Sequence, residues 1–426
     1  MIVVLKETTE MRKLSCLLFF SCTIIFSCKK NNPDNNSGGN GTGGDPVTIL
    51  APKPVAKTNT QKIYVHYMPW FEDPSTSGNG NWGQHWTMAN QNPNIISSSG
   101  RRQIASYFYP LIGPYASSDP DVIAYHTLLM KYSGIDGVIV DWYGTHNVYD
   151  YPLIRRNTDS LFNQISKVGL LFAICYEDAT LRNVKSIVGI DTIPAAKTDF
   201  SFLQNQYFNS SAYIKINNQP LLLCFGPQVM QNPNNWQQSF SVLSNTPRLL
   251  SLWYQGGVTG SMGSGEFAWV YSDYLTGLQN FYQYRANGLA TAFAGAYPGF
   301  KDFYSPGGWG STLFVIDHNG TNVLQNTLTL AKNSNLSNLQ LITWNDFGEG
   351  TMIEPTVEFN YSFLETIQQY GGVTYTKTEL QLIYKWYTLR KKYKNDSVTE
   401  QKLSQAYYYL VSLDVTKAAD IISTIP

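Results

Sequence analysis

Short apolar runs recur along the chain from residue 63 onward, and they restrict the possible folds more than any other feature of the sequence. Eight runs are found, at residues 63–70, 137–142, 170–176, 220–225, 249–254, 267–271, 289–296 and 339–344. Most of them end in polar or aromatic residues. Eight buried strands of this kind predict a (β/α)8 barrel, also called a TIM barrel, in the α/β class.

Helices are expected between several of these runs. Apolar residues recur at helical spacing in residues 121–132, 152–168, 274–286 and 321–333. The connection between the fifth and sixth runs is too short for a full helix. Either one turn of the barrel is irregular there, or these two strands are misplaced.

Two more amphipathic stretches follow the barrel, at residues 378–393 and 399–413. They predict a small C-terminal helical extension that packs on the barrel wall. The first stretch ends in basic residues, as a helix dipole prefers, and a binding patch for a polyanion is the other interpretation. We therefore expect a barrel at residues 59–372 and a helical extension at residues 373–426.

The start of the chain resembles a secretory signal. Met11, Arg12 and Lys13 precede a mostly apolar run that ends at Cys28 and is too short to span a bilayer. A cysteine in this place is similar to the lipid-bearing residue of a bacterial lipoprotein, and an ordinary cleaved signal is the alternative. We expect a signal peptide at residues 1–28, with Met11 as the initiator, and a flexible tether at 29–58. The expected location is the cell envelope, with a lipid anchor on Cys28.

Composition narrows the class of ligand. Thirty basic and thirty acidic residues cancel, so the sequence predicts no attraction to nucleic acid. Charged residues make up only 14% of the chain and aromatic residues also 14%, which suits neutral ligands held by ring faces; a merely tyrosine-rich core is the alternative. Phosphate-binding and zinc-binding motifs are absent, so we expect no metal and no cofactor. We also expect a monomer. Cys175 and Cys224 lie in apolar runs and are expected to be buried free thiols.

The eighth run leads into an acidic, glycine-containing turn that carries the clearest chemical signal. Asp346 and Glu349 follow the run directly, at the strand end where α/β barrels place their active sites. A pair of carboxyl groups is what acid/base cleavage of a glycosidic bond requires, with Glu349 as the acid and Asp346 as the base. A helix cap followed by a surface turn is the alternative interpretation, and it applies with more force to Glu354.

The ends of the other predicted strands carry aromatic residues beside acids or amides. Rings that stack on sugars, together with polar groups that bind hydroxyls, are typical of a carbohydrate site. The expected substrate-binding residues are Tyr67, Trp70, His85, Trp86, Asp141, Trp142, Glu177, Tyr254, Tyr271, Trp344, Asn345 and Glu354. Trp86 is expected to be exposed in its loop, His66 fits a hydrogen-bonded core position better, and Glu177 also fits a helix cap.

Four segments resemble glycoside hydrolase family 99 and its relative, family 71: residues 64–70, 83–86, 137–144 and 344–355. This resemblance implies a (β/α)8 barrel and retaining, endo-acting hydrolysis of α-mannosides. It places the two catalytic carboxyl groups of family 99 on Asp346 and Glu349. In that family the base removes the proton from the sugar's own 2-hydroxyl, which then closes on the anomeric carbon as a 1,2-anhydro intermediate.

The motif also departs from the family 99 pattern. Asp346 stands where family 99 has Glu, and Trp344-Asn345-Asp346 followed by Gly348 and Glu349 is similar to family 71 instead. Family 71 implies α-1,3-glucan hydrolysis by an activated water, with inversion. A catalytically silent glycan-binding protein on the surface of the cell is a third hypothesis. In each case the expected partner is an oligosaccharide or polysaccharide.

Overall fold

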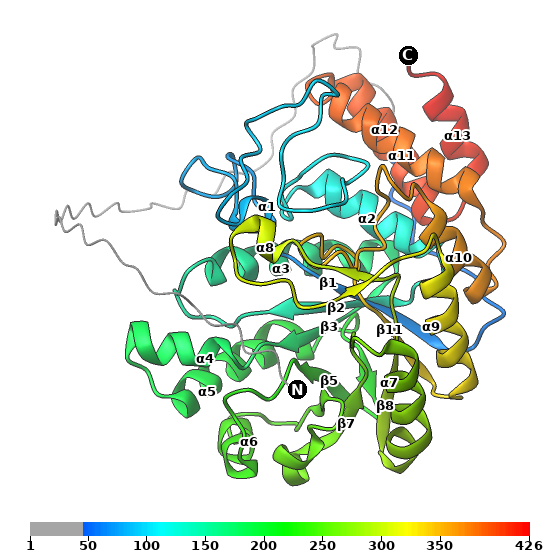
Figure 1. Cartoon of the computed structure of the whole chain (residues 1–426). Helices are drawn as coiled ribbons and strands as arrows, with labels where there is room; N and C mark the ends of the chain where they lie inside the picture. The colour runs from blue at the N-terminus through cyan, green and yellow to red at the C-terminus, as the bar shows by residue number, and fades with distance from the viewer. Residues whose placement is uncertain (1–45) are drawn as a thin grey trace, which may run out of the picture. The chain divides into compact units, whose positions relative to one another are not determined.

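Eight parallel strands close into a barrel in the computed structural model, which describes residues 46–426 (Figure 1). The strands are β1 (Lys62–Tyr67), β2 (Gly137–Trp142), β3 (Leu171–Tyr176), β5 (Gln219–Cys224), β6 (Arg248–Leu252), β7 (Gly263–Phe267), β8 (Thr291–Ala296) and β11 (Asn338–Leu341). They run in the order β3-β2-β1-β11-β8-β7-β6-β5, and pairing of β3 with β5 closes the circle. The predicted (β/α)8 barrel is therefore confirmed.

Most of these strands were recognisable because parallel strands are covered on both faces and consist largely of apolar residues. Every residue of β2, for example, is buried. Strand β7 is the exception, since it begins four residues before the predicted sixth run. Its sequence is Gly-Ser-Gly-Glu-Phe, in which a side chain on Gly265 would collide with the carbonyl oxygen of Thr291. Buried Glu266 is paired with Arg285 at 2.5 Å. Because Gly265 and Glu266 are not apolar side chains, β7 does not appear as an apolar run in the sequence.

The connection between β6 and β7 is irregular, as the first of the two alternatives predicted. Two short 3-10 turns, Gly256–Val258 and Gly260–Met262, replace a full helix. The misplaced sixth strand shows that the other expectation was also partly right. Two short antiparallel additions complete the strands: β4 (Lys215–Ile216) pairs with β5, and β9 (Phe300–Lys301) pairs with β10 (Val315–Ile316) in the connection between β8 and β11.

Helices surround the barrel (Figure 1). They are α1 (Gln84–Thr87), α2 (Pro120–Tyr132), α3 (Tyr151–Ile165), α4 (Thr180–Asn183), α5 (Thr192–Leu203), α6 (Pro233–Phe240), α7 (Tyr274–Asn280), α8 (Tyr304–Gly307), α9 (Asn322–Asn333) and α10 (Ser362–Gly371). The four predicted helices correspond to α2, α3, α7 and α9. Helix α2 begins where Asp119 accepts the backbone N–H groups of Asp121 and Val122, with Pro120 in the first turn, as helix starts favour.

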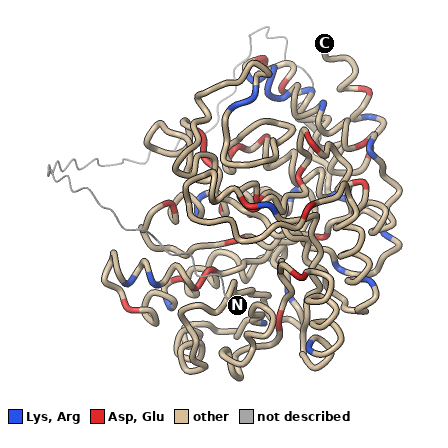
Figure 2. The backbone as a smooth tube through the Cα atoms, viewed as in Figure 1, with Lys and Arg blue, Asp and Glu red and all other residues tan. Residues whose placement is uncertain are grey.

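Three helices form the C-terminal extension: α11 (Lys377–Lys392), α12 (Ser397–Val411) and α13 (Val415–Ser423). The extension packs on α2, where the rings of Tyr387 and Tyr125 lie 4.9 Å apart. The basic end of α11 meets acidic residues (Figure 2), because Arg390 pairs with Asp121 at 3.0 Å and Lys391 pairs with Asp119. This contact neutralises two of the three basic side chains and attaches the extension to the barrel.

Part of the segment expected as a tether is described by the structure, and it lies against the protein. The backbone N–H groups of Lys53 and Thr58 donate to the carbonyl oxygens of Val411 and Gly372, both at 3.3 Å. Residues 47–58 are thus hydrogen-bonded to the C-terminal part of the chain. The predicted signal peptide, Met11, Cys28 and the rest of the tether lie outside the described residues. Within residues 46–426, no helix is long and apolar enough to cross a membrane.

Candidate active site

The loop after β11 is held in a fixed shape by its own backbone. The N–H of Thr343 donates to the oxygen of Thr351 at 2.9 Å, and the N–H of Ile353 donates to that of Thr343 at 3.0 Å. Gly350 has a φ of +67°, and a Cβ there would lie 2.8 Å from the carbonyl oxygen of Lys301. Only glycine fits this turn without strain. The loop places its carboxyl groups at the C-terminal end of β11, where barrel active sites lie.

Asp346 is buried, with only 4% of its surface exposed. Its backbone N–H donates to Oγ1 of Thr343 at 2.8 Å, and its Oδ1 accepts the backbone N–H of Glu349 at 2.9 Å. These two bonds fix the orientation of the carboxyl group. Burial raises the pKa of Asp346 to about 7; the Glu349 N–H bond opposes this rise, and the charge of Asp141 adds to it.

Glu349 is held by the segment that follows β9. The N–H groups of Lys301 and Phe303 donate to the carbonyl oxygens of Glu349 and Gly348, both at 2.8 Å. The Tyr304 hydroxyl donates to Oε1 of Glu349 at 2.7 Å. Burial, and then the charge of Asp346, raise the pKa of Glu349 to about 8. The sequence analysis missed Tyr304, because one tyrosine in a loop carries no signal of its own.

Two further carboxyl groups act on this pair. Asp141 is the penultimate residue of β2 and is buried, and Glu177 directly follows β3. Burial, and then the charge of Glu349, raise the pKa of Asp141 to about 8, while burial and the charge of Asp141 raise the pKa of Glu177 well above its usual range. Four mutually repelling carboxyl groups cannot all be ionised near neutral pH. The mouth cluster, meaning Asp141, Glu177, Asp346 and Glu349, therefore holds protons and bases side by side.

Aromatic side chains line the rim near this cluster. The rings of Trp70 and His85 stack at 4.2 Å with an angle of 4° between their planes, and His85 Nε2 lies 3.3 Å from Asp150. Tyr143 links the rim to the cluster, since its ring lies 6.4 Å from that of Trp70 and the charges of Asp141 and Glu177 contribute to its raised pKa. Trp70 and His85 thus lie where the sequence analysis expected site residues.

Two other expected residues are well exposed. Tyr254 is 55% exposed and Tyr271 is 44% exposed, and both pack against Trp253, with ring centres 6.0 and 6.3 Å from it. Their accessible faces are available for stacking on a ligand, as the sequence analysis proposed.

Trp86 requires a correction, because the sequence analysis placed it in an exposed position. Its side chain is fully buried, its ring centre lies 4.0 Å from that of Phe71, and its Nε1 donates to the carbonyl oxygen of Tyr115 at 2.8 Å. The short helix α1 turns this side chain inward. Trp86 is therefore a core residue that anchors the loop after β1.

Three more expected site residues belong to a buried cluster around His126 of α2. Tyr67 OH lies 3.2 Å from His126 Nδ1, Glu354 Oε1 lies 3.2 Å from His126 Nε2, and the Trp344 ring centre is 5.4 Å away. Tyr115 also donates to Glu354 at 2.7 Å. The structure thus corrects the expected substrate contacts of Tyr67, Trp344 and Glu354. We call these residues, with His126 and Tyr115, the wall cluster.

Asn345 and Trp142 are also structural in this geometry. Asn345 accepts the backbone N–H of Met68 at 2.8 Å and donates to its carbonyl oxygen at 3.0 Å, so it ties β1 to the β11 loop. Trp142 is fully buried, and its ring centre lies 5.9 Å from that of Phe202 on α5. Both expected substrate contacts are therefore corrected, since neither side chain reaches solvent.

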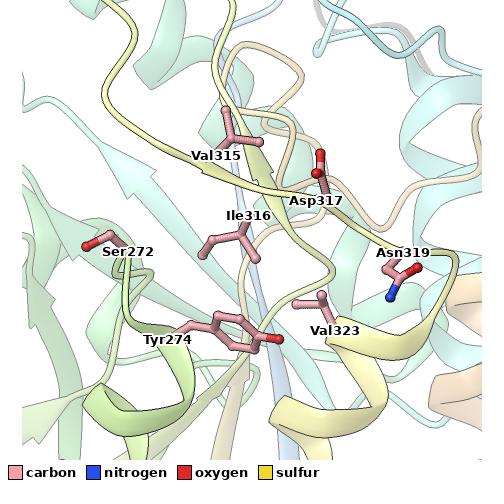
Figure 3. A pocket seen from close by; sticks show the side chains of 7 residues that line it. All are labelled: Ser272, Tyr274, Val315, Ile316, Asp317, Asn319 and Val323. Atoms are coloured by element: carbon pink, nitrogen blue, oxygen red, sulfur yellow. The ribbon is translucent and has the colours of Figure 1, made fainter.

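A separate open hollow of about 450 Å³ lies beside the barrel mouth (Figure 3). The loop before α7, strand β10 and the start of α9 surround it, and its lining residues are Ser272, Tyr274, Val315, Ile316, Asp317, Asn319 and Val323. None of the mouth carboxyl groups lines it.

Cys175 and Cys224 are buried free thiols, as predicted. The side chains of His66, Asp141 and Cys175 lie close together, and each offers one atom that can bind a metal ion.

A (β/α)8 barrel with paired acids at its mouth is the architecture of a glycosidase. Residues 58–295 match the model of glycosyl hydrolase family 99. The chain belongs to this family, which confirms the resemblance found in the sequence. The matched residues end before β11, so Asp346 and Glu349 lie outside them.

Relatives of this family are similar to parts of the chain. The mouse glycoprotein endo-alpha-1,2-mannosidase-like protein is 30% identical over 87 residues, which is 19% of each chain. The Xenopus laevis glycoprotein endo-alpha-1,2-mannosidase is 25% identical over 173 residues, which is 30% of this chain and 38% of the relative. The chain thus spans less than two fifths of the length of these curated relatives.

The fold is also similar to that of a solved structure, a family 99 endo-alpha-mannosidase from Bacteroides thetaiotaomicron in complex with BIS-TRIS-Propane. The TM-score is 0.56 at 17% identity, and the match covers 76% of this chain and 99% of the other. At this level of identity the likeness establishes the barrel alone.

Proposed function

We propose that this protein hydrolyses α-mannosidic linkages in the interior of glycans. Membership of family 99 and the names of its mannosidase relatives support this substrate class. The observation that carries the proposal is the pair of Asp346, which is buried, and Glu349, which is partly buried, at the mouth of the barrel. Burial and mutual repulsion keep a proton on one of two adjacent carboxyl groups, which is the condition for acid and base catalysis in one site.

Glu349 is the general acid. Of the pair it has the higher pKa, about 8, so it keeps its proton at neutral pH and donates it to the departing glycosidic oxygen. Tyr304 positions this group by binding its Oε1, which directs the proton-bearing oxygen. Asp346 is the base. Its Oδ1 is bound by the loop, so its orientation toward the sugar is fixed before substrate enters.

Two steps, each with two proton transfers, complete the proposed reaction. In the first step Asp346 removes the proton of the sugar's 2-hydroxyl, and O2 closes on the anomeric carbon as Glu349 protonates the leaving oxygen. In the second step Glu349, now ionised, takes a proton from water as that water opens the anhydro ring, and Asp346 returns its proton to O2. Each carboxyl group ends in its starting state, and the configuration at the anomeric carbon is retained.

A second mechanism is favoured by one specific feature, the aspartate at position 346. Its side chain is one methylene shorter than glutamate, which leaves more room between base and sugar. In an inverting glycosidase the carboxyl groups are separated by roughly 6.5–9.5 Å so that a water fits between base and sugar. An α-1,3-glucan hydrolase similar to family 71 would work in this way. NMR of the first product separates the two, since retention gives the α anomer and inversion the β anomer.

The experiment that tests the proposed function is a substrate panel. Purified protein is incubated with α-mannan, α-1,3-glucan and high-mannose glycans, and released oligosaccharides are measured. We expect oligosaccharides from an α-mannoside, and none from the Glu349→Gln or Asp346→Asn variants. Release from α-1,3-glucan alone would favour the second mechanism. Binding of a glycan without release by the wild-type protein would favour a silent glycan-binding protein instead.

We also propose that Cys28 carries a lipid that anchors the protein in the cell envelope. The support is the sequence alone: a basic start, a short apolar run and a cysteine at its end. Cys28→Ala is expected to move the protein from the membrane fraction to the soluble fraction with unchanged hydrolysis. An unchanged membrane fraction in this variant would contradict the proposal.

A further inference from the structure

Three side chains of metal-binding type converge inside the barrel mouth. They are His66 of β1, Asp141 of β2 and Cys175 of β3, and one ligand atom from each lies within 4.8 Å of those of the other two. We propose that these residues bind a divalent cation of the zinc class, with a fourth coordination position left open. The proposal concerns binding and does not depend on the proposed hydrolysis.

The strand register brings these residues together. Asp141 and Cys175 are direct partners on β2 and β3, and His66 pairs with Ile139, two positions earlier on β2. Side chains of successive parallel strands that share a face of a barrel meet in layers. The site therefore rests on three rigid strands, where coordination geometry is held better than on loops.

Two polar atoms of this group lack partners. Nδ1 of His66 and Oδ1 of Asp141 are buried, and neither forms a hydrogen bond. The two residues are only 1% and 3% exposed. An unsatisfied buried polar group is destabilising, so such pairs of orphaned atoms are uncommon without a ligand. A cation bound to both atoms would satisfy them.

The surroundings of His66 suit a metal ligand. Its ring lies edge-on to Trp269, with centres 4.8 Å apart, and it interacts with the buried Gln340 side chain of β11. An outer partner of this kind orients the imidazole of a metal-binding histidine.

The donor atoms select the kind of metal. A nitrogen, a carboxylate oxygen and a sulfur favour Zn²⁺, whereas Ca²⁺ and Mg²⁺ require mostly oxygen ligands. Three protein ligands with an open position are typical of zinc sites that take water or a substrate oxygen. Bond lengths of about 2.0–2.3 Å require the donors to approach one another by roughly 1 Å from their upper separation of 4.8 Å.

Cobalt binding provides the test, because a thiolate bound to Co²⁺ gives a charge-transfer band in the near ultraviolet. The purified protein is stripped with a chelator and titrated with Co²⁺ and, separately, with Zn²⁺, and bound metal is counted by mass spectrometry. Cys224→Ser is the matched control, because Cys224 is also a buried free thiol and lies on the neighbouring strand β5. We expect one ion per chain and the band in the wild-type protein and in this control.

Cys175→Ser is expected to lose the band and to bind Zn²⁺ about 100-fold more weakly or worse, because even loss of an outer partner costs 10–100-fold. Should circular dichroism show that this variant is unfolded, His66→Gln replaces it, with the same expected loss of zinc affinity. Failure of the wild-type protein to bind one ion would overturn the proposal. So would a band that survives Cys175→Ser, or wild-type affinity in His66→Gln.

Discussion

Two glutamates of the same loop, Glu349 and Glu354, occupy opposite kinds of environment. Each accepts a hydrogen bond of 2.7 Å from a tyrosine hydroxyl, Tyr304 in one case and Tyr115 in the other. Their remaining neighbours differ. Glu349 faces other carboxyl groups in the mouth cluster, whereas Glu354 faces the imidazole of His126 in the wall cluster. The comparison indicates that exposure and the kind of neighbour, rather than the tyrosine hydrogen bond, separate the proposed reactive carboxyl group from the structural one.

The largest expected effect follows from neutralising the reactive member. Glu349→Gln should reduce hydrolysis by about 10³-fold or more, because it removes the general acid. Its thermal stability should be unchanged or higher at neutral pH, since a repelling buried carboxyl group is lost. Turnover assays and thermal unfolding monitored by circular dichroism measure both quantities. Full activity in this variant would contradict the proposed active site.

The next largest expected effect is a loss of stability on replacing Trp86, which packs against Tyr115 of the wall cluster. Its ring contacts Phe71 and Tyr115 in the core, so Trp86→Ala should cost about 3–5 kcal/mol of unfolding free energy. Chemical denaturation measures this cost. Ligand affinity per folded molecule should change little. Weakened glycan binding with normal stability would instead restore the exposed site role that the sequence suggested.

Glu354→Gln tests the structural member of the pair directly. It leaves His126 beside an amide, and loss of the carboxylate from this buried polar contact is expected to cost roughly 1–3 kcal/mol, part of which the amide offsets by keeping the Tyr115 bond. Activity per folded molecule should remain near that of the wild-type protein. A variant that is stable but inactive would show that the wall cluster takes part in catalysis.

The sequence could predict the barrel because seven of its strands are apolar runs that are buried on both faces. It misplaced β7, where Gly265 and Glu266 replace apolar residues for reasons of close strand contact and ion pairing. Asp346 and Glu349 were found because they follow a strand within a short motif. The direction in which Glu354 points depends on how the loop turns, which residue types do not reveal.

Residues brought together only by barrel closure also escape prediction. Tyr304 reaches Glu349 from the segment after β9, and one of 29 tyrosines cannot be singled out by type. His66, Asp141 and Cys175 lie on three separate strands with no short spacing between them. The proposed metal site therefore could not be predicted from the sequence, since zinc motifs are recognised by ligands that are close together in the chain.

The smallest expected effect concerns the pH dependence of stability, and it separates the two glutamates by sign. Burial and Asp346 raise the folded-state pKa of Glu349 from 4.5 to about 8, so the folded protein binds more protons than the unfolded chain between these values. Stability from this group is therefore complete below pH 4.5 and is lost as the pH rises toward 8.

Glu349→Gln removes this proton linkage. In the presence of a chelator, its melting temperature should match that of the wild-type protein near pH 5 and exceed it near pH 8, by a shift on the order of 2 °C. Glu354→Gln should melt below the wild-type protein at both pH values, because the buried carboxylate that contacts His126 and Tyr115 is lost. If Glu349→Gln shifted the melting temperature equally at both pH values, repulsion within the mouth cluster would not be holding a proton on Glu349. The contrast between the two glutamates would then lose its physical basis.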